Sequence, residues 1–250
     1  MTPRATRRRN APERSALVTG ASRGLGAVVA RFLGAEGYDL VLVARERGPL
    51  ESFAGELRSK GATVRTVAAD VGSDAGRKLI ASSGAFETGL DLLVNNASEL
   101  GPSPLRPLAS VALEDLERVY RTNVVGPIGL VQAFRPALAR RSGLVVNISS
   151  DAAIGGYPGW GCYGASKAAL DLVSLTLARE LASDGIGVVA VDPGDLRTTM
   201  HQAAYPGEDI SDRPLPEITL PFWAWLLGQP HDALSGRRFR AQAEHWGVPA

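Results

Sequence analysis

The sequence predicts an α/β protein whose single parallel sheet is doubly wound and flanked by helices on both faces. From Ser15 onward, short apolar runs alternate with stretches that have helical spacing, as expected for strands joined by helical crossovers. The apolar runs are continuous rather than alternating, which indicates that both faces of the sheet are covered. No Pro/Gly-rich linker divides residues 15–250, so we expect one domain.

The order of the predicted elements follows from these runs. Strands are expected at residues 15–19, 39–44, 63–68, 91–95, 143–148, 187–191 and 236–240. Helices are expected near residues 24–37, 49–60, 74–86, 113–141 and 163–183, with a shorter helix at 222–227 that packs in the core.

Composition excludes several classes of function. The chain has 250 residues, 45% hydrophobic and 21% charged, and a formal net charge of +1, so nothing in its bulk charge favours nucleic-acid binding. The sole cysteine, Cys162, excludes an intramolecular disulfide, and no Cys/His cluster suggests a metal site. No apolar run approaches the roughly 18 residues of a membrane span. A cytoplasmic protein is the simplest expectation.

Residues 1–14 form a separate basic segment that contains arginine and proline but almost no large apolar side chains. We expect a disordered tail, with a weak contact to an anionic partner as the alternative. A basic start resembles a secretory signal, but an apolar segment of the usual length does not follow it.

A glycine-rich turn follows the first predicted strand and opens the first predicted helix. Glycines allow a tight turn and the close approach of a pyrophosphate to a helix N-terminus, which predicts a nucleotide site. The alternative is a tight connection with no ligand. The turn comprises Thr19, Gly20, Ala21, Ser22, Arg23, Gly24, Leu25 and Gly26.

The second predicted strand ends in Ala44 and Arg45, where an NAD site usually carries an acid for the ribose 2′-hydroxyl. Arg45 and Arg23, which lies in the glycine turn, are suited to binding a 2′-phosphate. The missing acid favours NADP(H) over NAD(H). The alternative is two solvated arginines in an arginine-rich chain.

Tyr163 and Lys167 are four residues apart and should share one face of a helix. A nearby ammonium lowers the pKa of a phenol, which would let Tyr163 exchange a proton near neutral pH. The spacing alone is also compatible with an ordinary amphipathic helix.

Five features in register give the chain a family resemblance. They are the glycine turn of residues 19–26, Asn95-Asn96-Ala97, Ser150, Tyr163 with Lys167, and Pro193-Gly194. Together they resemble the short-chain dehydrogenase/reductase family, over about residues 15–240, in its short single-domain branch. The resemblance implies a Rossmann-type fold and NADP(H)-dependent hydride transfer between the nicotinamide and a carbonyl or secondary alcohol.

The resemblance also implies a catalytic tetrad of Asn123, Ser150, Tyr163 and Lys167. Tyr163 would give its proton to a carbonyl oxygen that Ser150 positions. Lys167 would bind the nicotinamide ribose, and Asn123 would hold a water that links Lys167 to solvent. Further cofactor contacts would come from Asp70, Val71, Asn96, Ala97, Pro193, Gly194, Leu196 and Thr198.

The expected substrate is an apolar or aromatic ketone, because the candidate pocket walls are mostly apolar or aromatic. These walls are Ile154, Tyr157, Trp160, Met200 and Tyr205. The resemblance implies a substrate lid at about residues 198–216, and the composition of this segment suits a mobile loop. His201 is expected to be an exposed loop residue.

Two departures from the family pattern lie near the tetrad. Ser98 stands where the family usually has glycine, and its side chain is expected to narrow or reorient the cleft. Asp151 follows Ser150 and is expected to face solvent, with a polar substrate as the alternative.

The two long helices are apolar on more than one side, so both sides should be buried. The family resemblance implies that they form the interface of a homodimer or homotetramer. A catalytically silent NADP-binding regulatory or structural subunit is the alternative function, and the intact tetrad argues against it.

Overall fold

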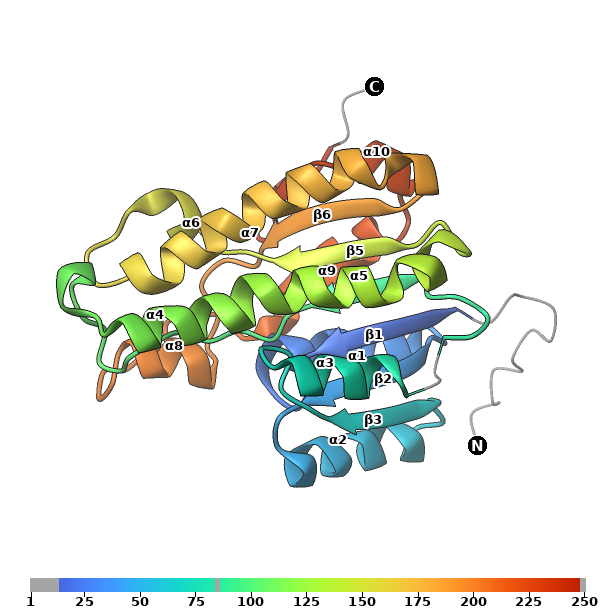
Figure 1. The fold of residues 1–250 in the computed structure, drawn as a ribbon. Helices are drawn as coiled ribbons and strands as arrows, with labels where there is room; N and C mark the ends of the chain where they lie inside the picture. Colours follow the sequence, from blue (N-terminus) through green and yellow to red (C-terminus); the bar gives the residue numbers. More distant parts are fainter. Residues whose placement is uncertain (1–13, 84–85, 248–250) are drawn as a thin grey trace.

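A computed structural model describes residues 14–83 and 86–247, so the predicted tail lies outside the described residues except for Arg14. Seven parallel strands form one sheet in the order β3-β2-β1-β4-β5-β6-β7 (Figure 1). The predicted fold class is confirmed. The strands are β1 (Ser15–Thr19), β2 (Asp39–Ala44), β3 (Val64–Ala68), β4 (Leu92–Asn95), β5 (Leu144–Ile148), β6 (Gly187–Asp192) and β7 (Arg238–Arg240).

Helices cover both faces of the sheet and enclose two hydrophobic cores. On one face lie α1 (Gly24–Ala35), α2 (Arg47–Ser59) and α9 (Leu220–Leu226), and the other face is covered by α3 (Asp74–Ala81), α5 (Gly126–Ala139) and α7 (Gly161–Glu180) (Figure 1). The remaining helices are α4 (Leu113–Tyr120), α6 (Ala152–Gly155), α8 (Thr199–Ala204) and α10 (His231–Leu234). No helix in the described part of the chain is long and apolar enough to cross a membrane.

The direction in which the chain adds strands reverses between β1 and β4, which are neighbours in the sheet. Helical connections on opposite faces diverge at such a point and leave a crevice beyond the carboxyl ends of the strands. The glycine turn after β1 and the Asn95-Asn96-Ala97 segment, which begins at the last residue of β4, both lie at this edge.

The helix predicted at residues 113–141 is divided into α4, a π-helical turn at Arg121–Val125, and α5. Pro127 has no N–H and so cannot donate to the carbonyl of Asn123, which is its i−4 partner in an α-helix. The neighbouring Gly126 N–H bonds to the carbonyl of Arg121, five residues back, which is the hydrogen-bond pattern of a π-helix. The widened turn places Asn123 at the site, which is a common use of π-helical geometry.

Other boundaries differ by a few residues, as expected where helix ends are set by local hydrogen bonds. Ser73 caps α3 by accepting from Gly76 N, and this helix ends at Ala81 rather than Phe86. The last strand is shorter than predicted and begins at Arg238.

Candidate active site

A cavity of about 890 Å³ lies beyond the carboxyl ends of the strands. It brings together most of the predicted cofactor residues. Those that line it are Gly20, Ser22, Arg23, Gly24, Leu25, Arg45, Asp70, Val71, Asn96, Ala97, Tyr163, Lys167, Pro193, Gly194, Leu196 and Thr198.

Gly26 is the predicted cofactor residue that does not line the cavity. A Cβ there would collide with the carbonyl oxygen of Gly20 and the side-chain amide of Asn96. Gly26 therefore lets α1 pack closely against the turn. At the start of α1, Arg23 provides no side-chain cap, so the first backbone N–H groups remain available to an anion.

Thr19 and Asn96 join the glycine turn to the segment after β4. The Thr19 hydroxyl accepts from the backbone N–H groups of Asn96 and Ala97, each at 3.0 Å, and donates to Val94 O. The Asn96 amide donates to the carbonyls of Thr19 and Gly20 at 2.9 and 3.2 Å. These bonds fix the two walls of the cleft relative to each other. Thr19 was not predicted as a site residue, although it begins the glycine turn.

Both arginines predicted for the 2′-phosphate lie in the cavity and face carboxylates. Arg45 Nη1 donates to Glu99 Oε2 at 3.2 Å, and Arg23 Nη2 lies 3.9 Å from Glu46 Oε1. Glu99 was not predicted as a site residue, although it directly follows Ser98 in sequence.

Asn123 is buried and its side chain is fully engaged by protein groups. Its Oδ1 accepts from Glu99 N at 2.8 Å and Ser98 Oγ at 3.2 Å. Its Nδ2 donates to Glu99 O and Ser166 Oγ, both at 2.9 Å. The expected water contact therefore cannot come from this side chain without breaking one of these bonds. The side chain instead joins the segment after β4 to α7.

Tyr163 and Lys167 lie on α7, one turn apart and almost fully buried, at 8% and 2% exposure. Lys167 Nζ donates to Ile148 O at 2.7 Å and lies 5.4 Å from the centroid of the Tyr163 ring. Burial lowers the pKa of Lys167 to about 8.

The expected low pKa of Tyr163 is not found in this structure. Burial raises its pKa to about 12, and hydrogen bonds with the hydroxyls of Ser98 and Ser150 oppose that rise. The ammonium of Lys167 is directed to a backbone carbonyl instead of the phenol oxygen. The Ser98 hydroxyl thus contacts two tetrad members, Tyr163 and Asn123.

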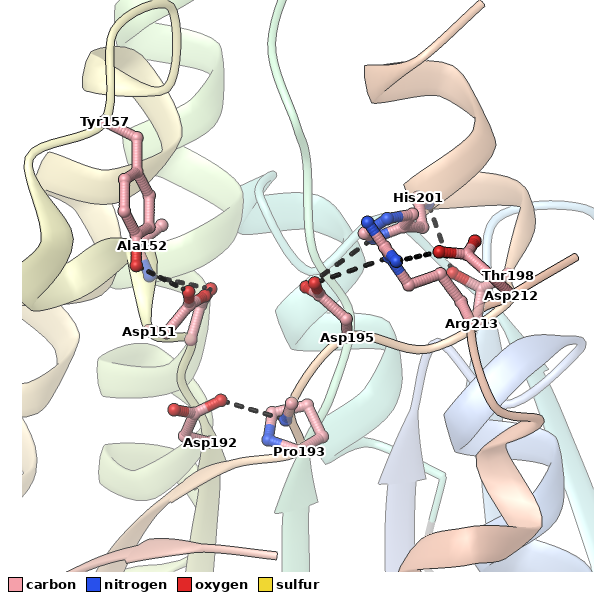
Figure 2. Close-up of polar contacts among 12 residues, drawn as sticks. Asp151, Ala152, Tyr157, Asp192, Pro193, Asp195, Thr198, His201, Asp212 and Arg213 are labelled. Atoms are coloured by element: carbon pink, nitrogen blue, oxygen red, sulfur yellow. Dashed lines mark hydrogen bonds and ion pairs between the residues drawn. The ribbon is translucent and has the colours of Figure 1, made fainter. Parts of the chain in front are cut away.

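Asp151 faces the cleft, contrary to the solvent-facing orientation that we expected. Its Oδ1 accepts from Ser150 Oγ at 3.1 Å and its Oδ2 from the Tyr157 hydroxyl at 3.0 Å. Figure 2 shows the carboxylate and the Tyr157 ring on one wall of the cleft. Ser150 Oγ also accepts from Ala152 N at 3.1 Å, so both flanking groups hold this hydroxyl in place.

The opposite wall carries a second polar cluster around Asp195 (Figure 2). His201 Nδ1 lies 3.9 Å from Asp195 Oδ1, and Arg213 Nε lies 3.6 Å from Asp195 Oδ2. His201 belongs to α8 and its side chain is only 11% exposed, so the prediction of an exposed loop residue was wrong. The Thr198 hydroxyl caps this helix by accepting from His201 N, which makes the start of the predicted lid helical.

Four of the five predicted substrate walls line the cavity. Trp160 lies between Tyr163 and Tyr205, with ring centroids 5.8 and 6.1 Å away. Ile154 is 76% exposed and does not line the cavity, so its assignment was wrong. It belongs to the short helix α6, which begins beside the cleft and directs this side chain away from it. The four that line the cavity are Tyr157, Trp160, Met200 and Tyr205.

Arg238 on β7 also supports the site and was missed by sequence reasoning. Its Nη2 donates to Ser150 O at 2.8 Å and to Asp192 Oδ2 at 3.3 Å, and its Nε donates to Asp171 Oδ2 at 2.9 Å. One guanidinium thereby ties the last strand to β6, α7 and the tetrad serine. An arginine-rich sequence contains no signal that would have singled it out.

Known proteins resemble this chain in sequence, and solved structures resemble it in fold. The short chain dehydrogenase family profile matches residues 14–209. The 3-oxoacyl-acyl-carrier-protein reductase FabG of Staphylococcus epidermidis is 35% identical over 210 residues, which cover 83% of this chain and 84% of that protein. The L-xylo-3-hexulose reductase of Hypocrea jecorina is 38% identical over 211 residues, which cover 76% and 69% of the two chains.

A short chain dehydrogenase from Shigella flexneri, solved in complex with NADP, has a TM-score of 0.83 and 28% identity over 92% of this chain and 97% of its own. The family profile alone spans most of the described residues, and the fold and the residues that meet in the cleft agree with it. The chain is therefore an oxidoreductase of the short-chain dehydrogenase family.

Proposed function

We propose that this protein is an NADP(H)-dependent ketoreductase that transfers a hydride between the nicotinamide and a carbonyl or secondary alcohol. The observation that best supports this proposal is that the hydroxyls of Ser150 and Tyr163 lie close together in the cleft. Lys167 lies one turn after Tyr163 on the same helix. NADPH, when bound, supplies the hydride to the carbonyl carbon. Every other step uses groups of this chain.

In reduction, the Ser150 hydroxyl rotates its one proton from Asp151 to the substrate oxygen and positions this oxygen beside Tyr163. Tyr163 Oη then gives its proton to that oxygen as the carbon accepts the hydride, and the alcohol forms. The resulting tyrosinate is reprotonated through Lys167, whose lowered pKa of about 8 suits proton exchange near neutral pH. A water on this route would bind the backbone carbonyl of Asn123, since Pro127 deprives that carbonyl of its α-helical donor. Oxidation runs in reverse.

The test is NADPH oxidation against a panel of ketones, quinones, ketoses and 3-oxoacyl thioesters. Tyr163→Phe should lose turnover by about 10²- to 10⁴-fold and keep its NADPH dissociation constant, because only the proton donor is removed. Tyr120→Phe, on α4 and outside the cavity, is the matched control. Retained turnover in Tyr163→Phe would show that Tyr163 is not the proton donor. Tight NADPH binding by a wild-type protein that reduces no member of the panel would favour the silent subunit.

Preference for NADP(H) is supported by Arg23 and Arg45 in the cavity, by the absence of an acid at the end of β2, and by the NADP-complexed relative. Arg45→Asp should weaken NADPH binding and shift the preference toward NADH. The preference is measured as the ratio of the NADH and NADPH dissociation constants. An equal ratio in Arg45→Asp and the wild type would refute the assignment of Arg45 to the 2′-phosphate.

An apolar or aromatic ketone is the proposed substrate, because Trp160, Tyr205 and Met200 line the part of the cleft beside Tyr163. Aryl ketones should show higher kcat/KM than ketoses in the same panel. The reverse order would overturn this substrate class.

A homodimer or homotetramer is proposed through the long helices. Leu172 on α7 and Val125 in the π-helical turn are exposed apolar side chains in the described chain. Sedimentation of the wild type should give a dimer or tetramer, and Leu172→Glu should shift it toward monomer. A wild-type monomer at micromolar concentration would exclude the proposal.

A further inference from the structure

Glu99 places a carboxylate in the cavity within hydrogen-bonding distance of the arginine assigned to the cofactor phosphate. Arg45 follows β2 and Glu99 follows β4, so their 3.2 Å ion pair crosses the cleft over the end of the intervening β1. Both residues line the cavity. The pair therefore occupies space at the adenosine end of the proposed cofactor site.

Glu99 is the fixed member of this pair. Its backbone N–H donates to Asn123 Oδ1 at 2.8 Å, and its carbonyl accepts from Asn123 Nδ2 at 2.9 Å. Its side chain is 19% exposed, whereas that of Arg45 is 59% exposed and lies on a long flexible stem. Arg118 Nε lies 4.0 Å from the second carboxylate oxygen and restrains it further. When an anion enters, Arg45 is thus the group that moves.

We infer that Glu99 acts as an internal competitor for the 2′-phosphate of NADP(H), so that it holds Arg45 back and sets how strongly NADP(H) is preferred over NAD(H). The inference rests on the proposed NADP(H) function. A phosphate engages the same guanidinium fork that Glu99 occupies, and two anions at one arginine repel each other. NAD(H) carries no 2′-phosphate and does not require Arg45 to leave Glu99.

Removing the charge of Glu99 should therefore tighten NADPH binding selectively. An ion pair with one exposed member shifts an equilibrium by about fivefold or less, and relief of repulsion with the phosphate adds to this. We expect Glu99→Gln to lower the NADPH dissociation constant by roughly three- to tenfold and to leave that of NADH within about twofold. Glu117→Gln removes the same charge on α4, outside the cavity, and should change neither constant.

The experiment is isothermal titration of NADPH and NADH into the wild type, Glu99→Gln, Glu117→Gln, Arg45→Ala and the double variant of Glu99 and Arg45. Thermal unfolding of each protein confirms folding, and Glu99→Ala serves as a second variant if Glu99→Gln is unstable. In the Arg45→Ala background the Glu99 substitution should have a smaller selective effect, because the competition for the arginine is gone and only the repulsion between Glu99 and the phosphate remains.

Three results would overturn the inference. They are an unchanged NADPH constant in Glu99→Gln, equal weakening of both cofactors, and weakening of NADH alone, which would make Glu99 a ribose ligand. If Arg45→Ala weakens NADPH while Glu99→Gln has no effect, this inference fails and the proposed function stands. If Arg45→Ala binds NADPH as the wild type does, the 2′-phosphate assignment fails and this inference fails with it.

Discussion

Arg238 provides the sharpest test of how the last strand supports the active site. The substitution Arg238→Met keeps most of the aliphatic stem and removes the guanidinium that contacts Ser150 O, Asp171 and Asp192. Asp192 is 3% exposed, and its carboxylate would keep only one described hydrogen bond, from Gly194 N at 3.0 Å.

The expected loss of stability follows from leaving the buried Asp192 carboxylate without its cationic partner. Removing one partner of a buried ion pair costs about 3–5 kcal/mol, and a quarter-exposed Arg238 lowers this to about 2–4 kcal/mol. Activity should fall as well, because Ser150 loses the contact that fixes its carbonyl. A misplacement of 1 Å at a reacting group costs about 100-fold, so a fall of about tenfold or more in kcat/KM is expected.

Urea unfolding at pH 7 measures the first effect and ketone reduction the second. Arg240→Met, at an exposed position on the same strand, is the matched control and should behave as the wild type. Adding Asp192→Asn to Arg238→Met should recover part of the stability, since it removes the unpaired charge. A loss within 0.5 kcal/mol of the control, or no recovery in the double variant, would refute the reasoning.

Three further predictions concern the titrating groups around the cleft. Ser98→Gly removes a hydrogen bond that lowers the pKa of Tyr163, so the acidic limb of alcohol oxidation should move to higher pH; an unmoved limb would contradict this. Lys167 has a folded-state pKa of about 8, below its unfolded value, so the folded state binds fewer protons than the unfolded state between these two values. The free energy of unfolding of the wild type should therefore rise relative to that of Lys167→Met as pH increases from 8 toward 10.5. The gain should be about 2–3 kcal/mol in urea unfolding, and a flat difference between pH 7 and 10 would count against it. Asp151→Asn should lower the pKa of Tyr157, which the hydrogen bond to that carboxylate raises, and ultraviolet titration with Tyr157→Phe as the blank would show it.

The sequence was sufficient to predict the fold because most strands are largely apolar runs bounded by turn residues, although β3 and β7 contain arginine. The glycine turn and the tetrad were predictable because their chemistry requires particular residues at fixed spacings. Ile154 and His201 were misassigned for a different reason. Their positions depend on two short helices, α6 and α8, and periodicity is too weak a signal over four to six residues.

Long-range polar contacts were beyond prediction for a related reason. Arg238 lies 88 residues from Ser150 in sequence, and Glu99 lies 54 residues from Arg45. Strand order and side-chain rotamers decide whether such groups meet. The sequence around one arginine among many does not indicate which residue it will contact. The raised pKa of Tyr163 likewise depends on burial, which the YxxxK spacing does not encode.

The complete engagement of the Asn123 side chain affects how variants of this residue should be interpreted. An alanine there would release both the segment that carries Glu99 and the start of α7, so inactivity would report collapse of the scaffold at two places. Pro127 leaves the backbone carbonyl of residue 123 without its α-helical donor, and side-chain substitution does not remove this carbonyl. Pro127→Ala addresses that carbonyl directly, because it restores the missing N–H and closes the helical turn over it.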